Sequence, residues 1–276
     1  MKKEDVLVFN INNKGKMVGG YTDNPKTIQE KLRWLNINDI PWSNKRNIPL
    51  KSVCSDKILL REYCTDKIGK DLCVPIIKIY EKPEDINFNE LPKKFVIKTN
   101  HNSGGNIICK DKDTLDKKET LYKLNTWLKQ DYTFRNGFES HYHWIERKCF
   151  SEKFMGENLI DYKFWCFNGE PQFIHVVDDR YSGFMHFNFY DINFNKMSLE
   201  QTNHPASDYL IQKPTRLNDM IEYARILSKE FKFVRVDFYE INNNIYLGEL
   251  TFVPDVAVFR YKNHNDDIKI GNMLKL

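Results

Sequence analysis

The stretch at residues 235–251 most constrains this chain, because it predicts a β-hairpin with paired acids on one face. Two runs rich in β-branched and aromatic residues flank an Asn-Asn-Asn sequence that favours a turn. If the turn is centred on Asn243, Asp237 lies directly opposite Glu249. Directly opposed residues have Cβ atoms about 4.5–5.5 Å apart, so two carboxylates there repel each other. A divalent metal ion is the natural counter-charge for such a pair.

The same register places Arg235 opposite Thr251, on the face that carries the acids. An arginine beside such a metal is typical where the metal carries phosphates. Two alternatives stay open. The acids of a two-sided surface hairpin would simply face water. A two-residue turn at Asn242 and Asn243 would shift the pairing by one residue and separate the acids.

The length and net charge limit the number of domains and the class of ligand. A chain of 276 residues forms one large domain or two to three small lobes with a sizeable core. The 42 basic and 38 acidic residues give a net charge of +4, which is too balanced to indicate nucleic-acid binding. Mild positive charge suits an anionic small molecule or a polysaccharide.

The N-terminus lacks the apolar core of a signal peptide, and no run of 18 apolar residues indicates a transmembrane helix. We therefore expect a cytoplasmic protein. Its cysteines contain no C-x-x-C pair and are expected to be reduced, packed thiols. They are Cys54, Cys64, Cys73, Cys109, Cys149 and Cys166.

Periodicity predicts mixed helices and β-hairpins, and therefore an α+β or α/β fold with antiparallel sheets. The turn at Asn168-Gly169 makes 161–177 a strong hairpin signal. Helices are predicted over 26–36, from Ser55 or Asp56 to Gly69, over 114–130 and over 217–231. Strands are predicted over 75–80, 95–99, 107–110, 143–150, 161–167 and 171–177.

A lysine precedes a glycine loop in the predicted strand 95–99. The lysine is Lys98, and the loop contains Ser103, Gly104, Gly105 and Asn106. Such a loop lets backbone N–H groups wrap a phosphate, which a lysine at its base can bind as a point charge. The pattern is neither a Walker A nor a Rossmann motif. A glycine hairpin turn beside a solvated lysine explains it equally well.

Two other charged pairs are ambiguous in isolation. Lys57 and Arg61 stand four residues apart, so a helix would place both on one face, either at a ligand or in water. Asp161 and Lys163 share one face of a predicted strand. Taken alone, they indicate a surface ion pair worth less than about 1 kcal/mol.

A strand at 139–143 would gather Glu139, His141 and His143 on one face, as in some zinc sites. Packing of an aromatic-rich strand is the favoured explanation for this pattern.

In chain order, these residues resemble the ATP-grasp superfamily. The closer resemblance is to its TupA-like family, named for a teichuronopeptide biosynthesis protein. The superfamily uses a basic residue before a small lobe, a second one on a strand ahead of a glycine loop, a hinge acid, and a C-terminal hairpin with paired metal-binding acids. The resemblance covers roughly residues 26–275. It is carried by Glu30-Lys31, Trp34-Leu35, Asp56-Lys57, Arg61-Glu62-Tyr63, Leu91-Pro92, the run from Phe95 to Gly104, Trp127-Leu128, Ile145-Glu146, Asp161-Tyr-Lys163, Asn168-Gly169, Val234-Arg-Val-Asp237 and Gly248-Glu-Leu-Thr-Phe252.

The resemblance implies an ATP-grasp fold that holds ATP between two α+β lobes. It divides the chain into an N-terminal lobe (1–83), a small lobe with the glycine loop (84–150) and a C-terminal lobe with the metal-binding hairpin (151–276). It also implies an ATP- and magnesium-dependent carboxylate–amine ligase with two magnesium ions and an acyl phosphate intermediate. The expected product is an amide between a carboxylate sugar, such as a uronic acid, and an amino acid or amine of a bacterial capsular or cell-surface polysaccharide.

Roles follow from the resemblance by position. Contacts to ATP are assigned to Lys57, Arg61, Lys98, Ser103, Gly104, Gly105, Asn106 and Glu146, the last at the hinge beside the adenine or ribose. Lys163 would lie near the γ-phosphate, and Arg235 would stabilise charge during transfer. Metal binding is assigned to Asp237, Glu249 and Thr251.

This chain departs from the expected patterns at two places. The superfamily commonly has asparagine where Thr251 stands, although threonine is normal for the TupA-like group. The TupA-like group usually has a glycine-containing segment where residues 254–258 are Pro-Asp-Val-Ala-Val. The second departure concerns the acceptor pocket, where Asp255 is a candidate to bind an amine. Two rival hypotheses are a glycosyltransferase, in which Asp178-Asp179 would form a D-x-D-like metal site, and a non-catalytic ATP-binding module.

Overall fold

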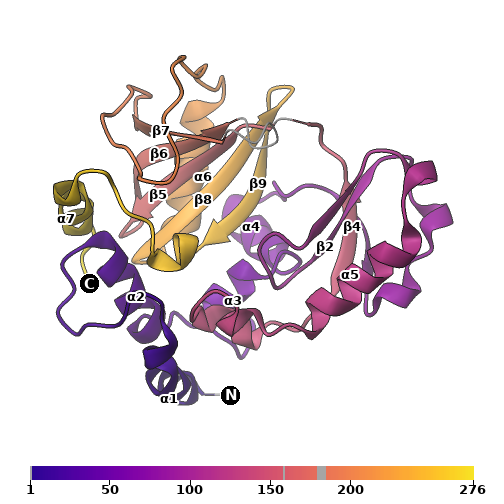
Figure 1. Ribbon diagram of the computed structural model, residues 1–276, viewed down its shortest axis with the longest axis horizontal. Helices are drawn as coiled ribbons and strands as arrows, with labels where there is room; N and C mark the ends of the chain where they lie inside the picture. The colour runs from indigo at the N-terminus through magenta and orange to yellow at the C-terminus, as the bar shows by residue number, and fades with distance from the viewer. Residues whose placement is uncertain (1, 158, 179–184) are drawn as a thin grey trace.

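The computed structural model describes residues 2–157, 159–178 and 185–276 (Figure 1). Within these residues, the α-helices are α1 (Lys3–Asn13), α2 (Ile28–Asn38), α3 (Leu50–Ser55), α4 (Leu60–Ile68), α5 (Lys117–Lys129), α6 (Leu217–Ser228) and α7 (His264–Met273). Every helix in the described part of the chain is too short or too polar to cross a bilayer.

The strands form two antiparallel sheets. The smaller sheet has the order β1-β4-β2-β3, and the larger has the order β7-β6-β5-β8-β9. The strands are β1 (Ile76–Tyr80), β2 (Phe95–Thr99), β3 (Asn106–Cys109), β4 (Cys149–Lys153), β5 (Asp161–Phe167), β6 (Glu170–Asp178), β7 (His186–Asp191), β8 (Phe233–Ile241) and β9 (Asn244–Thr251). The predicted mixture of helices with antiparallel sheets is therefore confirmed.

Two hydrophobic cores position the sheets. The larger core joins α2, α3 and α4 to the five-stranded sheet, and α6 packs against β5, β6 and β8. The smaller core lies between α5 and the four-stranded sheet. The sheets therefore stand as separate layers, with the N-terminal helices on the side of the larger one (Figure 1).

Sheet pairing modifies the predicted lobes. β1 lies within residues 1–83, yet it pairs with β4 of the small sheet. β4 itself extends to Lys153, three residues past the predicted boundary at residue 150. We therefore propose that the small lobe runs from β1 to β4 and that the preceding helices belong with the C-terminal sheet.

The predicted strand over 143–150 is wrong over residues 143–148. Residues Ser140–Trp144 form a 3-10 helix, and β4 begins at Cys149. Glu139, His141 and His143 therefore do not alternate on a strand, which removes the basis of the zinc hypothesis. Aromatic packing explains the two histidines: His143 stacks on Phe9 with ring centroids 4.2 Å apart, and His141 meets Phe252 edge-on at 5.7 Å.

The predicted helix after Ser55 begins later than expected. α3 ends at Ser55, and α4 starts only at Leu60. Between them, Asp56 accepts hydrogen bonds from the backbone N–H groups of Ile58 (2.8 Å) and Leu59 (3.3 Å). Lys57 thus lies in a turn rather than on one helix face with Arg61. The expected stop at Gly69 is present, because this glycine takes the left-handed conformation that ends many helices.

All six cysteines are buried and form no disulfide, as predicted.

Candidate active site

The β8–β9 hairpin combines a short turn with an extra residue. Asn242 and Asn243 form a two-residue turn with positive φ angles, so Ile241 pairs with Asn244. Taken alone, this turn would separate the acids. A β-bulge at Gly248 then shifts the register by one residue, and Asp237 pairs with Glu249. The predicted opposition of the two carboxylates is therefore present, although the predicted turn centre is wrong.

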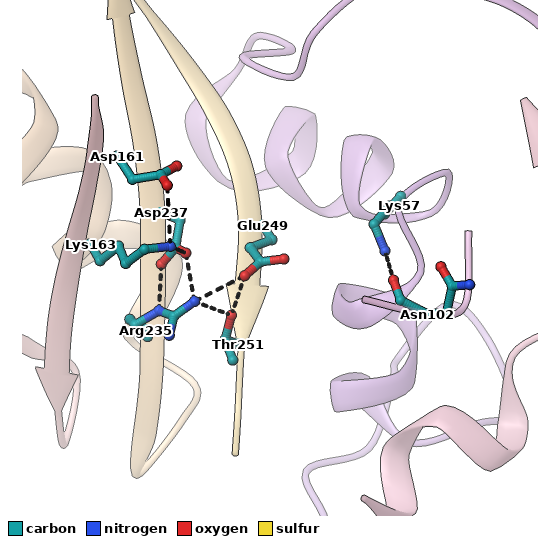
Figure 2. Close-up of polar contacts among 8 residues, drawn as sticks. All are labelled: Lys57, Asn102, Asp161, Lys163, Arg235, Asp237, Glu249 and Thr251. Carbon is teal, nitrogen blue, oxygen red and sulfur yellow. Dashed lines mark hydrogen bonds and ion pairs between the residues drawn. The ribbon is translucent and has the colours of Figure 1, made fainter. Parts of the chain in front are cut away.

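Arg235 joins the polar residues of this hairpin. Its guanidinium donates two hydrogen bonds to the Asp237 carboxylate, each 2.7 Å long. It also contacts Glu249 Oε1 at 2.9 Å and Thr251 Oγ1 at 3.1 Å (Figure 2). The Thr251 hydroxyl donates to the same Glu249 oxygen at 2.9 Å. All four residues lie on one face of the hairpin, as predicted.

A second cation reaches Asp237 from the neighbouring strand. Lys163 on β5 lies 2.5 Å from Asp237 Oδ2 and 3.8 Å from Asp161 Oδ2. All three side chains are buried, so the predicted surface ion pair is instead part of a buried charge network. Asp237 is thereby neutralised from two sides.

The acids of the hairpin differ in their electrostatics. Burial raises the pKa of Asp237, against the opposing charges of Arg235 and Lys163. Burial also acts to raise the pKa of Glu249, but the charges of Arg235, Lys163 and Lys57 lower it to about 2. Glu249 is therefore ionised at neutral pH. Its second carboxylate oxygen points away from Arg235, towards the side of Lys57 (Figure 2).

The hairpin suits a magnesium ion by its donor chemistry. Asp237, Glu249 and Thr251 offer carboxylate and hydroxyl oxygens, which are hard ligands of the kind magnesium prefers. One guanidinium contacts all three side chains, so their oxygens lie within a small volume. The residues present therefore fit the expected metal.

The small lobe presents Lys98 towards the same space. Lys98 on β2 forms an ion pair of 2.5 Å with Glu152 on β4. Glu152 was not among the residues predicted from the sequence, although alternation along β4 places it on the same face as Phe150. In contrast, the side chain of Glu146 is 79% exposed, and only its backbone carbonyl, which accepts from Asn100 at 2.8 Å, supports the site.

Lys57 makes two hydrogen bonds to the residues that lead into the glycine loop. The Lys57 ammonium donates to the carbonyl of Asn102 (Figure 2). The Lys57 backbone N–H donates to the carbonyl of Asn100 at 3.1 Å. Gly104 has a φ of +77°, and a Cβ at Gly105 would overlap the Asn102 side chain. The backbone conformation therefore favours glycine at position 104, and a side chain at position 105 would have to displace the Asn102 amide.

Arg61 is positioned by other contacts. Its guanidinium donates to the carbonyl of Val74 at 2.6 Å and pairs with Asp71. Arg61 also lines the cavity, but Asp71 already neutralises part of its charge.

One cavity of about 480 Å³ unites most of the predicted residues between the two sheets. Its basic lining residues are Lys57, Arg61, Lys98, Lys163 and Arg235. Its acidic lining residues are Glu152, Asp237, Glu249 and Asp255, and the loop residues are Ser103, Gly104, Gly105 and Asn106. Thr251 lines an adjoining cavity. The prediction that placed Glu146 beside the nucleotide does not match its exposed position.

The Asp178-Asp179 pair is only partly described. The Asp178 carboxylate accepts hydrogen bonds from Asn188 at 3.2 Å and from the Tyr209 hydroxyl. Asp179 lies outside the described residues.

Comparison with known protein families identifies this arrangement. A family model described as TupA-like ATPgrasp matches residues 30–275. The chain belongs to the TupA-like ATP-grasp family. The predicted ATP-grasp fold is thereby confirmed, and ATP-grasp enzymes bind ATP and generally use Mg²⁺.

Solved structures also resemble this ATP-grasp chain. The D-alanine–D-alanine ligase from Bacillus anthracis is 21% identical over 74% of this chain and 59% of its own, with a TM-score of 0.42. An L-amino acid ligase from Bacillus licheniformis is 12% identical over 93% and 57%, with a TM-score of 0.48. The D-alanine–D-alanine ligase from Helicobacter pylori is 15% identical over 90% and 69%, with a TM-score of 0.43. The chain thus spans less than two thirds of the first two ligases. A comparison with curated proteins found no match.

Proposed function

We propose that this protein is an ATP- and magnesium-dependent carboxylate–amine ligase. The observation that carries the proposal is a single cavity that faces Lys57, Lys98 and the glycine loop on one side and the Asp237–Glu249 pair on the other. Transfer of a phosphoryl group requires such a mixture of cations and metal-binding acids in a sheltered site.

The proposed reaction has two steps. A substrate carboxylate oxygen attacks the γ-phosphorus of ATP, the bond to the β–γ bridging oxygen breaks, and its electron pair leaves with ADP. An amine nitrogen then attacks the acyl carbon, inorganic phosphate leaves, and the nitrogen loses a proton to give the amide. The substrates are therefore ATP, a carboxylate and an amine, and the products are ADP, phosphate and an amide.

Individual residues have distinct proposed roles. Lys98 and the N–H groups of the glycine loop would bind phosphate oxygens, and Lys57 would hold the loop over them. Lys163 and Arg235 would stabilise the charge of the transferring group. Asp237, Glu249 and Thr251 would hold two Mg²⁺ ions, which supply neutralisation of phosphate charge.

We assign the hinge position beside the adenine or ribose to Glu152 instead of Glu146. Glu152 is buried, lines the cavity and is paired with Lys98. A carboxylate in this position can accept a hydrogen bond from an amino group of the base.

The finer assignment concerns the substrates. We propose a carboxylate sugar, such as a uronic acid, and an amino acid or amine, joined during synthesis of a bacterial surface polysaccharide. The TupA-like family, named for a teichuronopeptide protein, supports this assignment. A cytoplasmic location is part of the proposal, because ATP is supplied there.

Thermal unfolding with MgATP, MgADP or a UDP-sugar tests the proposal. A ligand at 100 times its dissociation constant stabilises the folded state by about 2.7 kcal/mol. We expect a magnesium-dependent shift with ATP and ADP, and its loss in Lys98→Gln. The control Lys82→Gln alters an exposed lysine and should keep the shift. A shift with the UDP-sugar alone would favour the glycosyltransferase instead, and ATP binding without ADP production over a broad substrate panel would favour a non-catalytic module.

A further inference from the structure

A second cavity of about 270 Å³ adjoins the first one. Both cavities are lined by Arg235, Glu249 and Asp255, so they meet beside the metal-binding hairpin. The second cavity extends from there to a wall that contains Glu139 and Tyr142. A molecule held in it would lie next to the position where the transferred phosphoryl group is expected.

Glu139 is a buried acid in this wall. Glu139 is only 8% exposed. Its carboxyl group forms no hydrogen bond or ion pair with the described residues. Burying such a group without a partner is unfavourable. Burial, together with the charges of Glu249 and Asp255, raises the pKa of Glu139 to about 8. With no cation paired to it in the described part of the chain, Glu139 is therefore mostly protonated at neutral pH. An occupant that brings positive charge and hydrogen-bond donors would favour its ionised form.

Asp255 reaches the cavity from a strained turn. Asp255, Val256 and Ala257 have φ angles of +48°, +47° and +56°, a left-handed conformation that costs about 1–2 kcal/mol for each non-glycine residue. Arg33 supports the turn by donating a 2.6 Å hydrogen bond to the Ala257 carbonyl. The turn therefore holds a carboxylate in a backbone conformation that favours glycine.

The cations of the cavity already have partners. Lys57 donates to the Asn102 carbonyl, and Arg235 contacts Asp237, Glu249 and Thr251. Among the described residues, the Asp255 carboxylate has no hydrogen-bond or ion-pair partner, so the cavity presents a free carboxylate to a cationic occupant.

The wall also offers aromatic surface. Tyr132 and Tyr142 both line the cavity and meet edge-on with ring centroids 4.9 Å apart. Aromatic faces attract organic ammonium groups, whereas magnesium retains its water shell. The combination of acids and aromatic rings therefore suits an ammonium better than a metal ion.

We propose that this second cavity binds the amine substrate as its ammonium ion, with Glu139 and Asp255 as the recognising carboxylates. This inference rests on the proposed ligase function and deepens it, because it assigns the amine to one cavity and to named residues. The volume suits a small primary amine or the end of a larger one.

Direct binding measurements test the assignment without turnover. We would titrate the full chain, with and without MgADP, with propylamine and glycinamide, and with their neutral counterparts propan-1-ol and glycolamide. Ligand-observed NMR gives the dissociation constants. We expect each amine to bind at least tenfold more tightly than its alcohol. Glu139→Gln and Asp255→Asn should each weaken amine binding at least tenfold, whereas Glu119→Gln, on the exposed face of α5, should not.

Asp255→Asn protects the test against misfolding, because asparagine tolerates the left-handed conformation well. Equal binding of amines and alcohols, or unchanged amine binding in a folded Asp255→Asn, would overturn the proposal. Displacement of the amine by MgCl2 alone would overturn it too, in favour of a metal site. A normal MgADP shift without any amine preference would reject only the amine pocket. Amine binding without any MgADP shift would reject the ligase function and keep the pocket.

Discussion

Gly248 lies against the ring of Tyr239 on the neighbouring strand, where a Cβ atom would come within 2.7 Å of Tyr239 Cε2. The same Cβ would lie 3.3 Å from the backbone oxygen of Asp237. Glycine therefore lets the ring of Tyr239 lie over the bulge that brings Asp237 opposite Glu249. The close approach, and not a positive φ angle, is what favours glycine at this position.

Gly248→Ala is expected to destabilise the protein by about 1–3 kcal/mol, because Tyr239 must move to accept the methyl group. It should also weaken the magnesium-dependent effect of ADP on thermal unfolding. Gly15→Ala is the matched control, since a Cβ there meets no atom within 4 Å. Equal stability of the two variants in urea would contradict the role of the bulge.

Replacement of the two acids should have unequal effects. Asp237→Asn removes the partner of two buried cations and is expected to cost about 3–5 kcal/mol of stability. This loss is expected to outweigh any relief of the repulsion between Asp237 and Glu249. Glu249→Gln should leave the fold intact, because this side chain is 40% exposed. Both variants should lose magnesium dependence in the ADP titration. Retention of magnesium dependence by both would sink the metal assignment.

Glu152 and Glu146 provide a direct comparison of two candidate hinge acids. Glu152→Gln is expected to weaken MgADP binding about tenfold, the effect of losing one charge-assisted contact. Glu146→Gln should change it less than about twofold. Isothermal titration calorimetry gives both constants. The reverse order of effects would restore the assignment to Glu146.

Acid should destabilise the fold through His141. Burial, reinforced by the charge of Lys51, lowers the pKa of His141 from 6.5 to about 3. As the pH falls below 6.5, the unfolded chain gains a proton that the folded chain does not accept until about pH 3. The resulting loss at pH 5 is about 2 kcal/mol.

Urea unfolding at pH 7 and pH 5 measures this effect. His141→Asn should flatten the difference between the two pH values, whereas His264→Asn, which alters an exposed ring, should keep it. An unchanged difference in His141→Asn would assign the acid sensitivity to other groups.

Local patterns predicted much of the fold and of the site. Strand 95–99 and the Lys98 ahead of its glycine loop were predicted, and alternation along β2 does put Phe95 and Ile97 in the core and Lys98 in the cavity. The turn at Asn168-Gly169 likewise joins β5 to β6. Such features depend on periods and turns that span only a few residues.

The remaining features depend on contacts between distant segments. The bulge at Gly248 was marked only by a lone glycine in a strand, which does not reveal a register. Glu152 differs from Glu146 in its partner Lys98, more than fifty residues away in the chain. The 3-10 helix over Ser140–Trp144 replaces a strand because its rings pack on Phe9 and Phe252.

The two hydrophobic cores give this protein two units of cooperative opening. Amide hydrogen exchange in β2 and β4 can proceed by opening of the small core alone, whereas exchange in β8 requires the core shared with α2, α3 and α4. A nucleotide that contacts Lys98 and Asp237 together would add its binding free energy to both openings. Slower amide hydrogen exchange in the four-stranded sheet would then indicate a ligand that is also bound by the five-stranded sheet.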